Sequence, residues 1–328
     1  MQTLSIYSQN SKKKPLVSFI VTYFNQPLTM LQQCINSILQ LSLSEEEREV
    51  IVIDDGSELS PLNELLNSDE HIVYVRTPNK GVSAARNLGI TISKGEYIQF
   101  IDADDYLLVP AYEHCLNLTR SKEIDVVLFG FATKANEKSS MVDDEPVDGA
   151  MFMKHNNISG AVWNYLFRKS LLINLRFSQE ISYGEDEEFT PQLLLSADKV
   201  TRTQAKAYFY RQHSESVIHK RDEQSVSKRL NDNFEVICRL NQKAENLPYQ
   251  EQEALRRRVA QLSMDYLYNT ITLTRDTQLT EKAVRKLYKE GLFPLPPKDY
   301  TRKYKLFRRM VNSKAGRKLL LIMLPKQK

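Results

Sequence analysis

The stretch EYIQFIDADDY, residues 96–106, joins an apolar run to a cluster of aspartates. Residues 96–101 have the short apolar pattern of a strand. Asp102, Asp104 and Asp105 follow it directly. Because like charges this close repel and unpaired carboxylates are costly in a folded chain, the stretch needs a compensating positive charge. A bound divalent cation is the simplest source of that charge, so the sequence predicts an acidic binding loop at the end of a strand.

Strand and helix patterns alternate on both sides of this stretch. Apolar, β-branched runs predict strands, and apolar residues at helical spacing predict the helices between them. The predicted strands are 16–22, 49–54, 71–75, 96–101 and 125–132, the first three of them buried, and helical spacing covers 28–39 and 81–92. This order predicts an α/β fold with a mixed, mainly parallel sheet flanked by helices.

Polar clusters follow three of the predicted strands. They are residues 22–25, residues 54–57 and the aspartates at 102–105. In sheets of this kind, ligands bind beyond the carboxyl ends of the strands, where the strand order reverses. The coincidence of three polar clusters at such ends therefore predicts a binding site at one edge of the sheet.

Two of these clusters can bind a ligand through carboxylates. Asp102 and Asp104 lie two apart on an extended stretch, so they point the same way and can hold a metal–diphosphate. The alternative is a helix cap, which we expect Asp105 to provide. Asp54 and Asp55 can accept hydrogen bonds from a base or a ribose, or they can form an ordinary turn after the strand.

Near the carboxyl ends of the predicted strands, the aromatic residues and an arginine each have more than one possible role. Tyr23 or Phe24 can place a ring against a nucleobase, although an aromatic side chain near a strand end more often belongs to the core. Arg86, early in the helix predicted from residue 81, can contact a phosphate or anchor a loop carboxylate.

Composition indicates a globular protein of one large or two modest domains. The chain has 328 residues, of which 41% are hydrophobic and 26% are charged. Its three cysteines are far apart and fit no metal spacing, which favours a reducing compartment. The first fifteen residues lack the apolar segment of a secretory signal, and no apolar run approaches the roughly 18 residues of a transmembrane helix. We therefore expect a cytoplasmic protein.

The chain divides into four predicted segments. Residues 1–14 are expected to be disordered, residues 15–223 to form the α/β domain, residues 224–298 a helical extension, and residues 299–328 a basic amphipathic tail. Within the α/β domain, residues 15–110 contain the three polar clusters and residues 111–223 form a second half. The polar stretch 134–149 is expected to be a mobile loop or flap.

The basic charge of the chain lies in its tail. Residues 300–328 contain ten Lys or Arg and no Asp or Glu, so residues 1–299 carry a net charge of −6. The body is therefore not predicted to bind nucleic acid. Apolar residues recur at helical spacing among the basic ones, which is the composition of a helix lying on anionic lipid. The alternative is a basic helix packed on the body of the protein.

Four motifs together resemble the family-2 glycosyltransferases of GT-A fold. They are VSFIVTYFN, VIDDGS, NKGVSAARNLGI and FIDADDY, and they fall in that order within residues 15–110. The resemblance implies a GT-A, Rossmann-like domain that binds a nucleotide-diphospho-sugar, most simply a UDP-linked one. It implies that the donor is held by Thr22, Tyr23, Phe24, Asn25, Asp54, Asp55, Lys80, Arg86, Asp102 and Ala103, with Asp104 on Mn²⁺ or Mg²⁺.

The resemblance extends to three segments of the second half. In YGEDEEFTPQLLL, residues 183–195, it implies Asp186 as general base with Glu185 beside it, while an acidic helix N-terminus is the structural alternative for the four adjacent acids. In AVWNYLFRKSLL, residues 161–172, it implies acceptor contacts by Trp163 and Asn164, with a core Trp as the alternative. In YFYRQHSESVIH, residues 208–219, Arg211 is a candidate for the diphosphate, and His219 or His213 for a third metal ligand.

These features predict an inverting glycosyltransferase with a glycan or lipid-linked acceptor, acting in cell-surface polysaccharide synthesis. A tail that binds lipid would place it peripherally on the inner face of the plasma membrane. The alternative is a non-catalytic nucleotide-sugar-binding scaffold of the same fold. A nucleotidyltransferase would need a phosphate loop that YFNQP, residues 23–27, does not provide, and a dinucleotide oxidoreductase would need G-x-G-x-x-G after the first strand.

Overall fold

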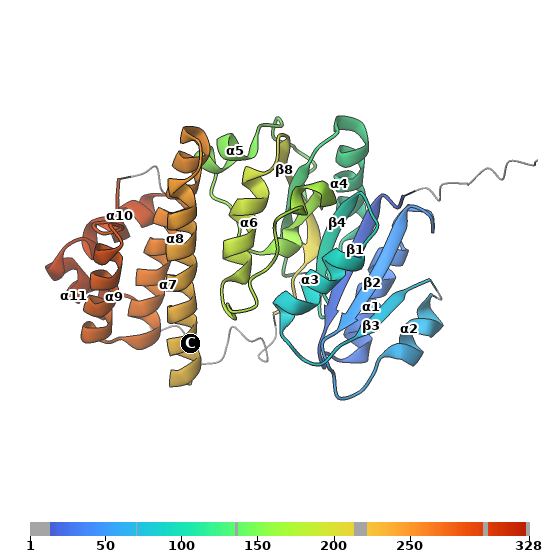
Figure 1. Ribbon diagram of the computed structural model, residues 1–328, viewed down its shortest axis with the longest axis horizontal. Coiled ribbons are helices and arrows are strands. Elements are labelled where there is room, and N and C mark those ends of the chain that lie inside the picture. The colour runs from blue at the N-terminus through green and yellow to red at the C-terminus, as the bar shows by residue number, and fades with distance from the viewer. Residues whose placement is uncertain (1–13, 70, 135–136, 213–221, 298–300, 326–328) are drawn as a thin grey trace, which may run out of the picture.

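The computed structural model describes residues 14–69, 71–134, 137–212, 222–297 and 301–325 (Figure 1). The predicted disordered segment 1–14 lies almost wholly outside them. The strands are β1 (Val17–Tyr23), β2 (Arg48–Asp54), β3 (Val73–Arg76), β4 (Tyr97–Asp102), β5 (Tyr106–Leu107), β6 (Val126–Ala132), β7 (Tyr165–Arg168) and β8 (Val200–Phe209).

The helices lie between the strands in the first part of the chain and follow one another after β8. They are α1 (Leu28–Leu39), α2 (Leu62–Ser68), α3 (Val82–Ile92), α4 (Val109–Lys122), α5 (Gly149–His155), α6 (Glu185–Leu195), α7 (Glu223–Glu245), α8 (Tyr249–Thr274), α9 (Thr277–Lys289), α10 (Arg302–Val311) and α11 (Lys314–Met323), with 3₁₀ turns η1 (Val162–Asn164) and η2 (Lys169–Leu172).

The described strands form one sheet in the order β3-β2-β1-β4-β7-β6-β8-β5. Strands β1 to β4 are parallel, and β6 and β8 run in the same direction because the antiparallel strand β7 separates them from β4. The carboxyl ends of β1, β2, β4, β6 and β8 therefore meet at one edge. This confirms the predicted mixed, mainly parallel sheet.

Helices cover both faces of the sheet, as a doubly covered parallel sheet requires. The apolar residues of α1 and α4 pack in one cluster with Phe19 and Val21, and those of α3, α5 and α6 pack in another with Ile20. All seven residues of β1 are buried, which explains its continuous apolar run.

Strand β3 departs from the prediction of a third buried strand. Val73 is 39% exposed, and no residue of β3 is fully buried. Among the described strands it pairs only with β2, at the end of the sheet. An edge strand lacks one neighbour, and the apolar run alone does not reveal that position.

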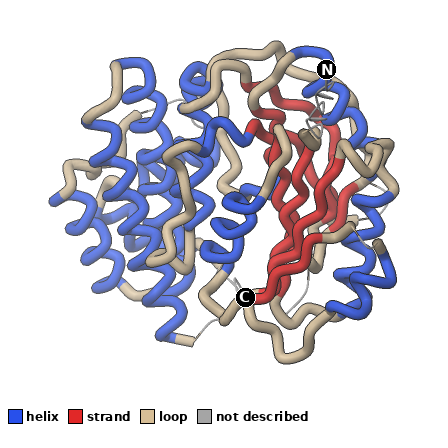
Figure 2. Tube along the Cα trace, turned by 45° about the vertical axis from the view of Figure 1, so that its right-hand side comes forward, coloured by secondary structure: helices blue, strands red, loops and turns tan. Residues whose placement is uncertain are grey.

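The helical C-terminal extension is confirmed, and it continues the core of the α/β domain. Figures 1 and 2 show α7 to α11 gathered at the end of the molecule away from β3. Val236, Ile237 and Leu240 of α7 are buried in the same apolar cluster as α6. Helix α7 begins at Glu223, one residue before the start predicted for the extension.

The segment predicted as a mobile loop or flap is bonded to β8. The Asp144 N–H donates to Arg202 O at 2.8 Å, and Val147 and Val200 exchange backbone hydrogen bonds of 3.1 and 2.7 Å. Residues 139–147 thus form a loop, as predicted, but hydrogen bonds hold it along residues 200–206 of β8, so it is not a free flap.

The described part of the basic tail packs on α8 and α9. Val311 and Leu320 are buried, the Tyr304 hydroxyl donates to Asp265 Oδ1 at 3.0 Å, and Arg317 pairs with Glu281 at 2.7 Å. The structural alternative for the tail therefore holds for one face of α10 and α11, while other side chains stay exposed. No helix in the described ranges combines the length and the apolar character that a membrane crossing requires.

Candidate active site

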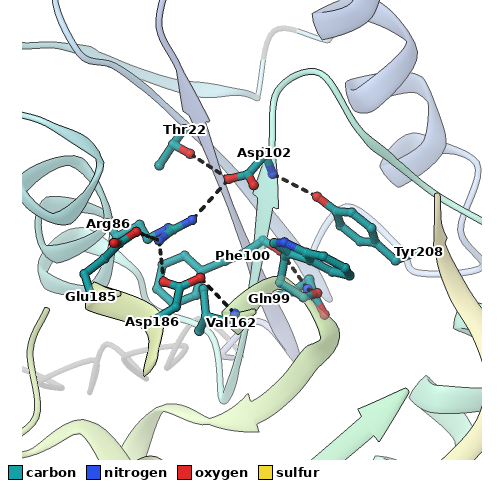
Figure 3. A network of polar contacts seen from close by, with 10 residues as sticks. Thr22, Arg86, Gln99, Phe100, Asp102, Val162, Glu185, Asp186 and Tyr208 are labelled. Atoms are coloured by element: carbon teal, nitrogen blue, oxygen red, sulfur yellow. Dashed lines mark hydrogen bonds and ion pairs between the residues drawn. The ribbon is translucent and has the colours of Figure 1, made fainter. Parts of the chain in front are cut away.

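The candidate site lies where β1, β2 and β4 end. In the sheet register Tyr23 lies beside Asp54, and Thr22 lies beside Asp102. Residues 22–25, 54–57 and 102–105 therefore meet at one edge, as predicted from their positions after strands. Figure 3 shows the polar contacts that join this edge to α3 and α6.

Arg86 is the centre of that network. Its guanidinium donates to Asp186 Oδ1 at 2.7 Å, to Asp102 Oδ1 at 3.2 Å and to Glu185 Oε1 at 3.4 Å (Figure 3). The Thr22 hydroxyl donates to the same oxygen of Asp102 at 3.4 Å. Arg86 is only 4% exposed. The arginine thus joins the donor half of the site to the acidic N-terminus of α6.

Three carboxylates share this one guanidinium, so the cluster carries excess negative charge when all of them are ionised. Burial raises the pKa of Asp186 to about 7, against the opposing effect of Arg86. Burial also raises the pKa of Glu185 and of Asp102 above their ordinary values. Burial alone would lower the pKa of Arg86, but Asp186 and its neighbours raise it. The cluster therefore exchanges a proton near neutral pH while the arginine stays charged.

The start of α6 directs its four acids to different partners. Asp186 accepts a second hydrogen bond from the Val162 N–H at 3.1 Å, whereas Glu187 pairs with Arg258 of α8 and Glu188 lies 3.7 Å from Arg239 of α7. Two acids therefore face the site, and two tie α6 to the helical extension. Within the acidic run, Glu185 and Asp186 are therefore the two acids positioned at the site.

Gly184 precedes α6 with a φ of +93°, a conformation that side chains with a Cβ rarely adopt. The glycine lets the chain turn sharply into the helix, so that its first residues, Glu185 and Asp186, face Arg86. A helix N-terminus also stabilises nearby carboxylates through its dipole.

The aspartate loop buries one of its carboxylates and leaves another partly accessible. Asp105 is 1% exposed and accepts from the Arg211 N–H at 2.7 Å, and burial raises its pKa to about 8. It does not cap the next helix, because α4 begins four residues later at Val109, so that prediction was wrong. Ala103 is fully buried, and its N–H donates to Thr22 O at 3.2 Å. Asp104 lies between them, half-buried.

The two aromatic residues predicted to contact a nucleobase differ clearly in their exposure. Tyr23 is 3% exposed in the apolar core and its hydroxyl donates to Gln26 O, whereas Phe24 is 45% exposed. Phe24 is therefore the ring available at this edge, and Tyr23 takes the core role. Asn25 joins the loops: its N–H donates to Ser57 Oγ at 3.0 Å.

The carboxylates after β2 support the loops around them. Asp54 is fully buried and accepts from the Ser57 N–H and the Tyr74 hydroxyl, both at 2.8 Å. Asp55 is 5% exposed and accepts from the N–H groups of Lys80 and Gly81, both at 2.8 Å. Asp54 is thus used for the turn, and Asp55 holds the loop that leads into α3.

The residues predicted to contact the acceptor lie beside Asp186, the candidate general base. Val162 contacts Asp186, and Trp163 and Asn164 complete the same 3₁₀ turn, but they are only 8% and 5% exposed. Both side chains are thus largely enclosed. His213 and His219 lie outside the described residues. Arg211 donates its N–H to Asp105, and its guanidinium lies over the Tyr106 ring at 5.2 Å.

Three rings contact Trp163 and were not among the predicted site residues: Phe131, Tyr208 and Tyr210. Phe131 was expected only as part of a strand, and Tyr208 and Tyr210 appeared only within a quoted motif. Strand alternation was the available signal, because Phe131 is an aromatic residue at the end of a predicted strand, where side chains reach the ligand-binding edge.

The donor set at the aspartate loop fits a hard cation shared with a substrate. Asp102 and Asp104 are both half-buried, and Asp102 Oδ1 already accepts hydrogen bonds from Arg86 and Thr22. Within the described ranges, no group of three or more His, Cys, Asp or Glu side chains is arranged to hold a metal ion by itself. Mg²⁺ is usually bound through one or two carboxylates together with substrate phosphates, so a site of this kind suits it.

Comparison with known proteins agrees with the fold and the motifs. Residues 18–176 match the family model described as Glycosyl transferase family 2. The uncharacterized glycosyltransferase EpsJ of Bacillus subtilis is 28% identical over 222 residues, which cover 62% of this chain and 63% of EpsJ. The poly(ribitol-phosphate) beta-glucosyltransferase of Bacillus spizizenii is 29% identical over 204 residues, which cover 59% of this chain and 32% of that protein.

A solved structure shares the architecture across nearly the whole chain. Residues 1–349 of S. aureus TarS, crystallised with UDP-GlcNAc, superpose with a TM-score of 0.69 at 17% identity, over 92% of this chain and 89% of that one. At this identity the likeness concerns the fold, and it includes the helical region after the sheet. The four motifs lie within or beside the residues that match the glycosyl transferase family 2 model, so the sequence comparison places residues 18–176 with that family, and the solved structure shows a shared fold.

Proposed function

We propose that this protein is an inverting glycosyltransferase that moves a sugar from a UDP-linked donor to a hydroxyl of a glycan or lipid-linked acceptor in cell-surface polysaccharide synthesis. The observation that carries the proposal is the pairing of Asp186 with Arg86 and Val162 beside the aspartate loop. A buried carboxylate with a pKa of about 7 can gain and lose a proton at working pH, which is what a general base requires.

The proposed mechanism gives separate roles to the residues at this edge of the sheet. Phe24 contacts the base of the nucleotide, and Thr22 and Asp102 hold its ribose. Asp186 accepts the proton of the acceptor hydroxyl while that oxygen attacks the anomeric carbon. The Val162 N–H and Arg86 keep the Asp186 carboxylate oriented for this transfer. A single displacement inverts the anomeric centre and needs no covalent intermediate.

The departing diphosphate needs positive charge. We propose that Asp104 would hold Mn²⁺ or Mg²⁺, and the ion would supply electrostatic stabilisation of the leaving group. His219 remains a proposed further ligand, outside the described residues. Lys80 and Asp55 keep the loop before α3 in place at the donor side, through the hydrogen bond that the Lys80 N–H donates.

A donor screen tests the proposed function. The full-length protein is incubated with a panel of nucleotide sugars and either Mn²⁺ or Mg²⁺, and the release of nucleoside diphosphate is measured. We expect release from a UDP-linked sugar. A chain that binds UDP but cleaves no donor would favour the non-catalytic scaffold, and a chain that does neither would contradict both.

Asp104→Asn should remove metal-dependent donor turnover. An amide keeps the size of the side chain but loses the charge, and we expect a loss of about 100-fold or more, on the scale of removing one strong electrostatic contact from a transition state. The measurement is turnover against metal concentration together with UDP affinity in the presence of Mn²⁺. Asp143→Asn, which changes an aspartate paired with His114 away from the site, is the control. Unchanged metal dependence in Asp104→Asn would contradict the assignment.

The tail has a proposed second role on a membrane. Leu306, Ile322 and Met323 are 61%, 77% and 64% exposed on two basic helices. Apolar and basic side chains together favour anionic lipid, which would place the protein peripherally on the inner face of the plasma membrane. We expect the protein to sediment with phosphatidylglycerol vesicles and less with neutral ones.

Changing all three of these side chains to Ser should reduce sedimentation with anionic vesicles without unfolding the protein, since none of them is buried. Ile173→Ser, which changes an 80% exposed apolar residue outside the tail, is the matched control. Equal sedimentation of wild type and triple variant would remove the membrane role.

A further inference from the structure

A group of aromatic rings extends outward from the aspartate loop. We call Phe131, Trp163, Tyr208 and Tyr210 the aromatic wall. Trp163 stacks on Tyr208 with centroids 4.4 Å apart and on Tyr210 at 5.6 Å, with interplanar angles of 17° and 10°. Phe131 meets Trp163 edge to face at 5.3 Å and Tyr210 at 6.2 Å. These are preferred aromatic geometries, so each ring holds the next in place.

The inner end of the aromatic wall contacts both halves of the site. The Asp102 N–H donates to the Tyr208 hydroxyl oxygen at 3.1 Å (Figure 3). Trp163 follows Val162, whose N–H donates to Asp186. The wall therefore begins at the residues proposed to bind the donor and to activate the acceptor.

Exposure increases along the wall. Tyr208 is fully buried, Trp163 is 8% exposed, Tyr210 is half-buried and Phe131 is 43% exposed. Phe131 is thus the member whose ring a ligand can reach most fully. This differs from the expectation that Trp163 itself provides the sugar contact.

Local backbone structure directs Phe131 outward. The pairing of β6 with β8 is irregular on both sides of Gly130, between Leu128 and Gly130 and between Gly130 and Phe131. Bulges of this kind re-aim side chains, and they are over-represented next to active sites. Residues 126–129 before the irregularity are all buried, whereas Gly130 is half-buried and Phe131 is exposed.

A single exposed apolar side chain needs no explanation by itself. Phe131 differs because three other rings support it. The aromatic wall also continues to Asp186, the candidate general base. A pyranose has one face of C–H groups, whose hydrogens match the negative face of an aromatic ring. An ordered aromatic surface also loses little side-chain entropy on binding.

We propose that Phe131 is a specificity-determining residue whose ring stacks on a pyranose of the acceptor glycan, with the rest of the aromatic wall holding it in position. The inference rests on the proposed glycosyltransferase function and names the acceptor chemistry of that site. It assigns sugar recognition to β6, in the half of the domain after the donor-binding motifs.

Trp163 provides the readout, because it is the only tryptophan of the chain and contacts Phe131. The full-length protein with bound UDP is titrated with cellobiose, maltose, lactose and N,N′-diacetylchitobiose while Trp163 emission is recorded. We expect a saturable change with at least one sugar. Phe131→Leu should weaken that affinity about tenfold, since it keeps an apolar side chain but removes the aromatic face. Phe131→Tyr should keep the affinity within about twofold.

Tyr288→Leu is the matched control, because Tyr288 is an exposed aromatic residue on α9, away from the aromatic wall. It should leave both the emission change and the affinity as in wild type. Thermal unfolding of Phe131→Leu, expected at the wild-type midpoint, separates recognition from misfolding. Equal affinities of Phe131→Leu and wild type, or no emission response to any sugar, would overturn the inference.

The outcome is distinguishable from failure of the proposed function. UDP binding and donor cleavage without acceptor are measured on the wild-type and Tyr288→Leu proteins, and the two proteins should match. If the wild-type protein binds UDP and cleaves a donor, but Phe131→Leu binds the sugar as tightly as wild type, only this inference is wrong. If the protein neither binds UDP nor cleaves any donor, the proposed function itself is wrong.

Discussion

Asp186→Asn is expected to abolish sugar transfer while the protein stays folded and binds its donor. The amide keeps the shape of the carboxylate, and its oxygen can still accept the Val162 N–H that Asp186 accepts at 3.1 Å. It cannot take the proton of the acceptor hydroxyl. Loss of a general base typically costs about 10²- to 10⁴-fold in rate. Transfer of a labelled sugar and UDP affinity, measured on the same preparation, separate the lost chemistry from retained binding.

The same variant is expected to unfold at a higher temperature than wild type in mildly alkaline buffer. Because the pKa of Asp186 in the folded protein is about 7, the folded state holds a proton that the unfolded chain has already released above about pH 4. Stability therefore falls as pH rises through this window, and the penalty is complete above about pH 7. Asparagine lacks the penalty.

Unfolding midpoints of the two proteins at about pH 8 and about pH 4 test this sign. At the higher pH we expect Asp186→Asn to have a higher unfolding midpoint than wild type. At the lower pH the two midpoints should converge. Transfer by the wild type should rise with pH through about 7 as Asp186 loses its proton. Wild-type transfer rates in Asp186→Asn would assign the base to another residue, with Glu185 as the next candidate.

Arg86→Met is expected to cost both stability and activity. It leaves Asp102, Glu185 and Asp186 buried together without their shared cation. Removing one partner of a buried ion pair typically costs about 3–5 kcal/mol, because the other charge remains uncompensated. The pKa of each carboxyl should then rise further, so Asp186 would hold its proton at neutral pH. Methionine is suitable because it fills the space beside Phe100 and Phe177, which the guanidinium now contacts.

Denaturant unfolding at about pH 7 and about pH 5 measures this cost. The deficit of Arg86→Met should shrink at the lower pH, because protonated carboxyl groups no longer need the arginine. Arg120→Met is the control: Arg120 pairs with Glu47 at 3.1 Å on the surface, and exposed pairs of this kind contribute about 0–1 kcal/mol. A pH-independent deficit in Arg86→Met would mean that packing, and not charge, dominates at this position.

The local pattern of apolar and polar residues was enough to predict the strands and the edge of the sheet where polar residues follow them. The run at 96–101 became β4, and Asp102 ends it. Parallel neighbours then place Thr22 beside Asp102, as expected for strands whose carboxyl ends meet. Side-chain periodicity is a property of the strand itself, so the sequence contains it directly.

Choices between neighbouring residues could not be predicted in this way. Tyr23 and Phe24 differ by one position, yet one is buried and the other exposed. Glu185 and Glu187 lie in the same acidic run, yet one faces Arg86 and the other Arg258. Asp105 follows the loop as a cap would, but its partner is the backbone of Arg211. Each outcome depends on a partner that is remote in the chain.

The sequence by itself determined the alternation of strands and helices, the acidic loop after β4 and the acidic run at the start of a helix. The tertiary structure alone decided that Arg86 joins them, since its partners Asp102 and Asp186 lie 16 and 100 residues away in the chain. It also decided that Phe131, at a strand irregularity, is the exposed member of the aromatic wall. Periodicity and turn chemistry act between near neighbours, whereas burial and charge pairing are set by which segments pack together.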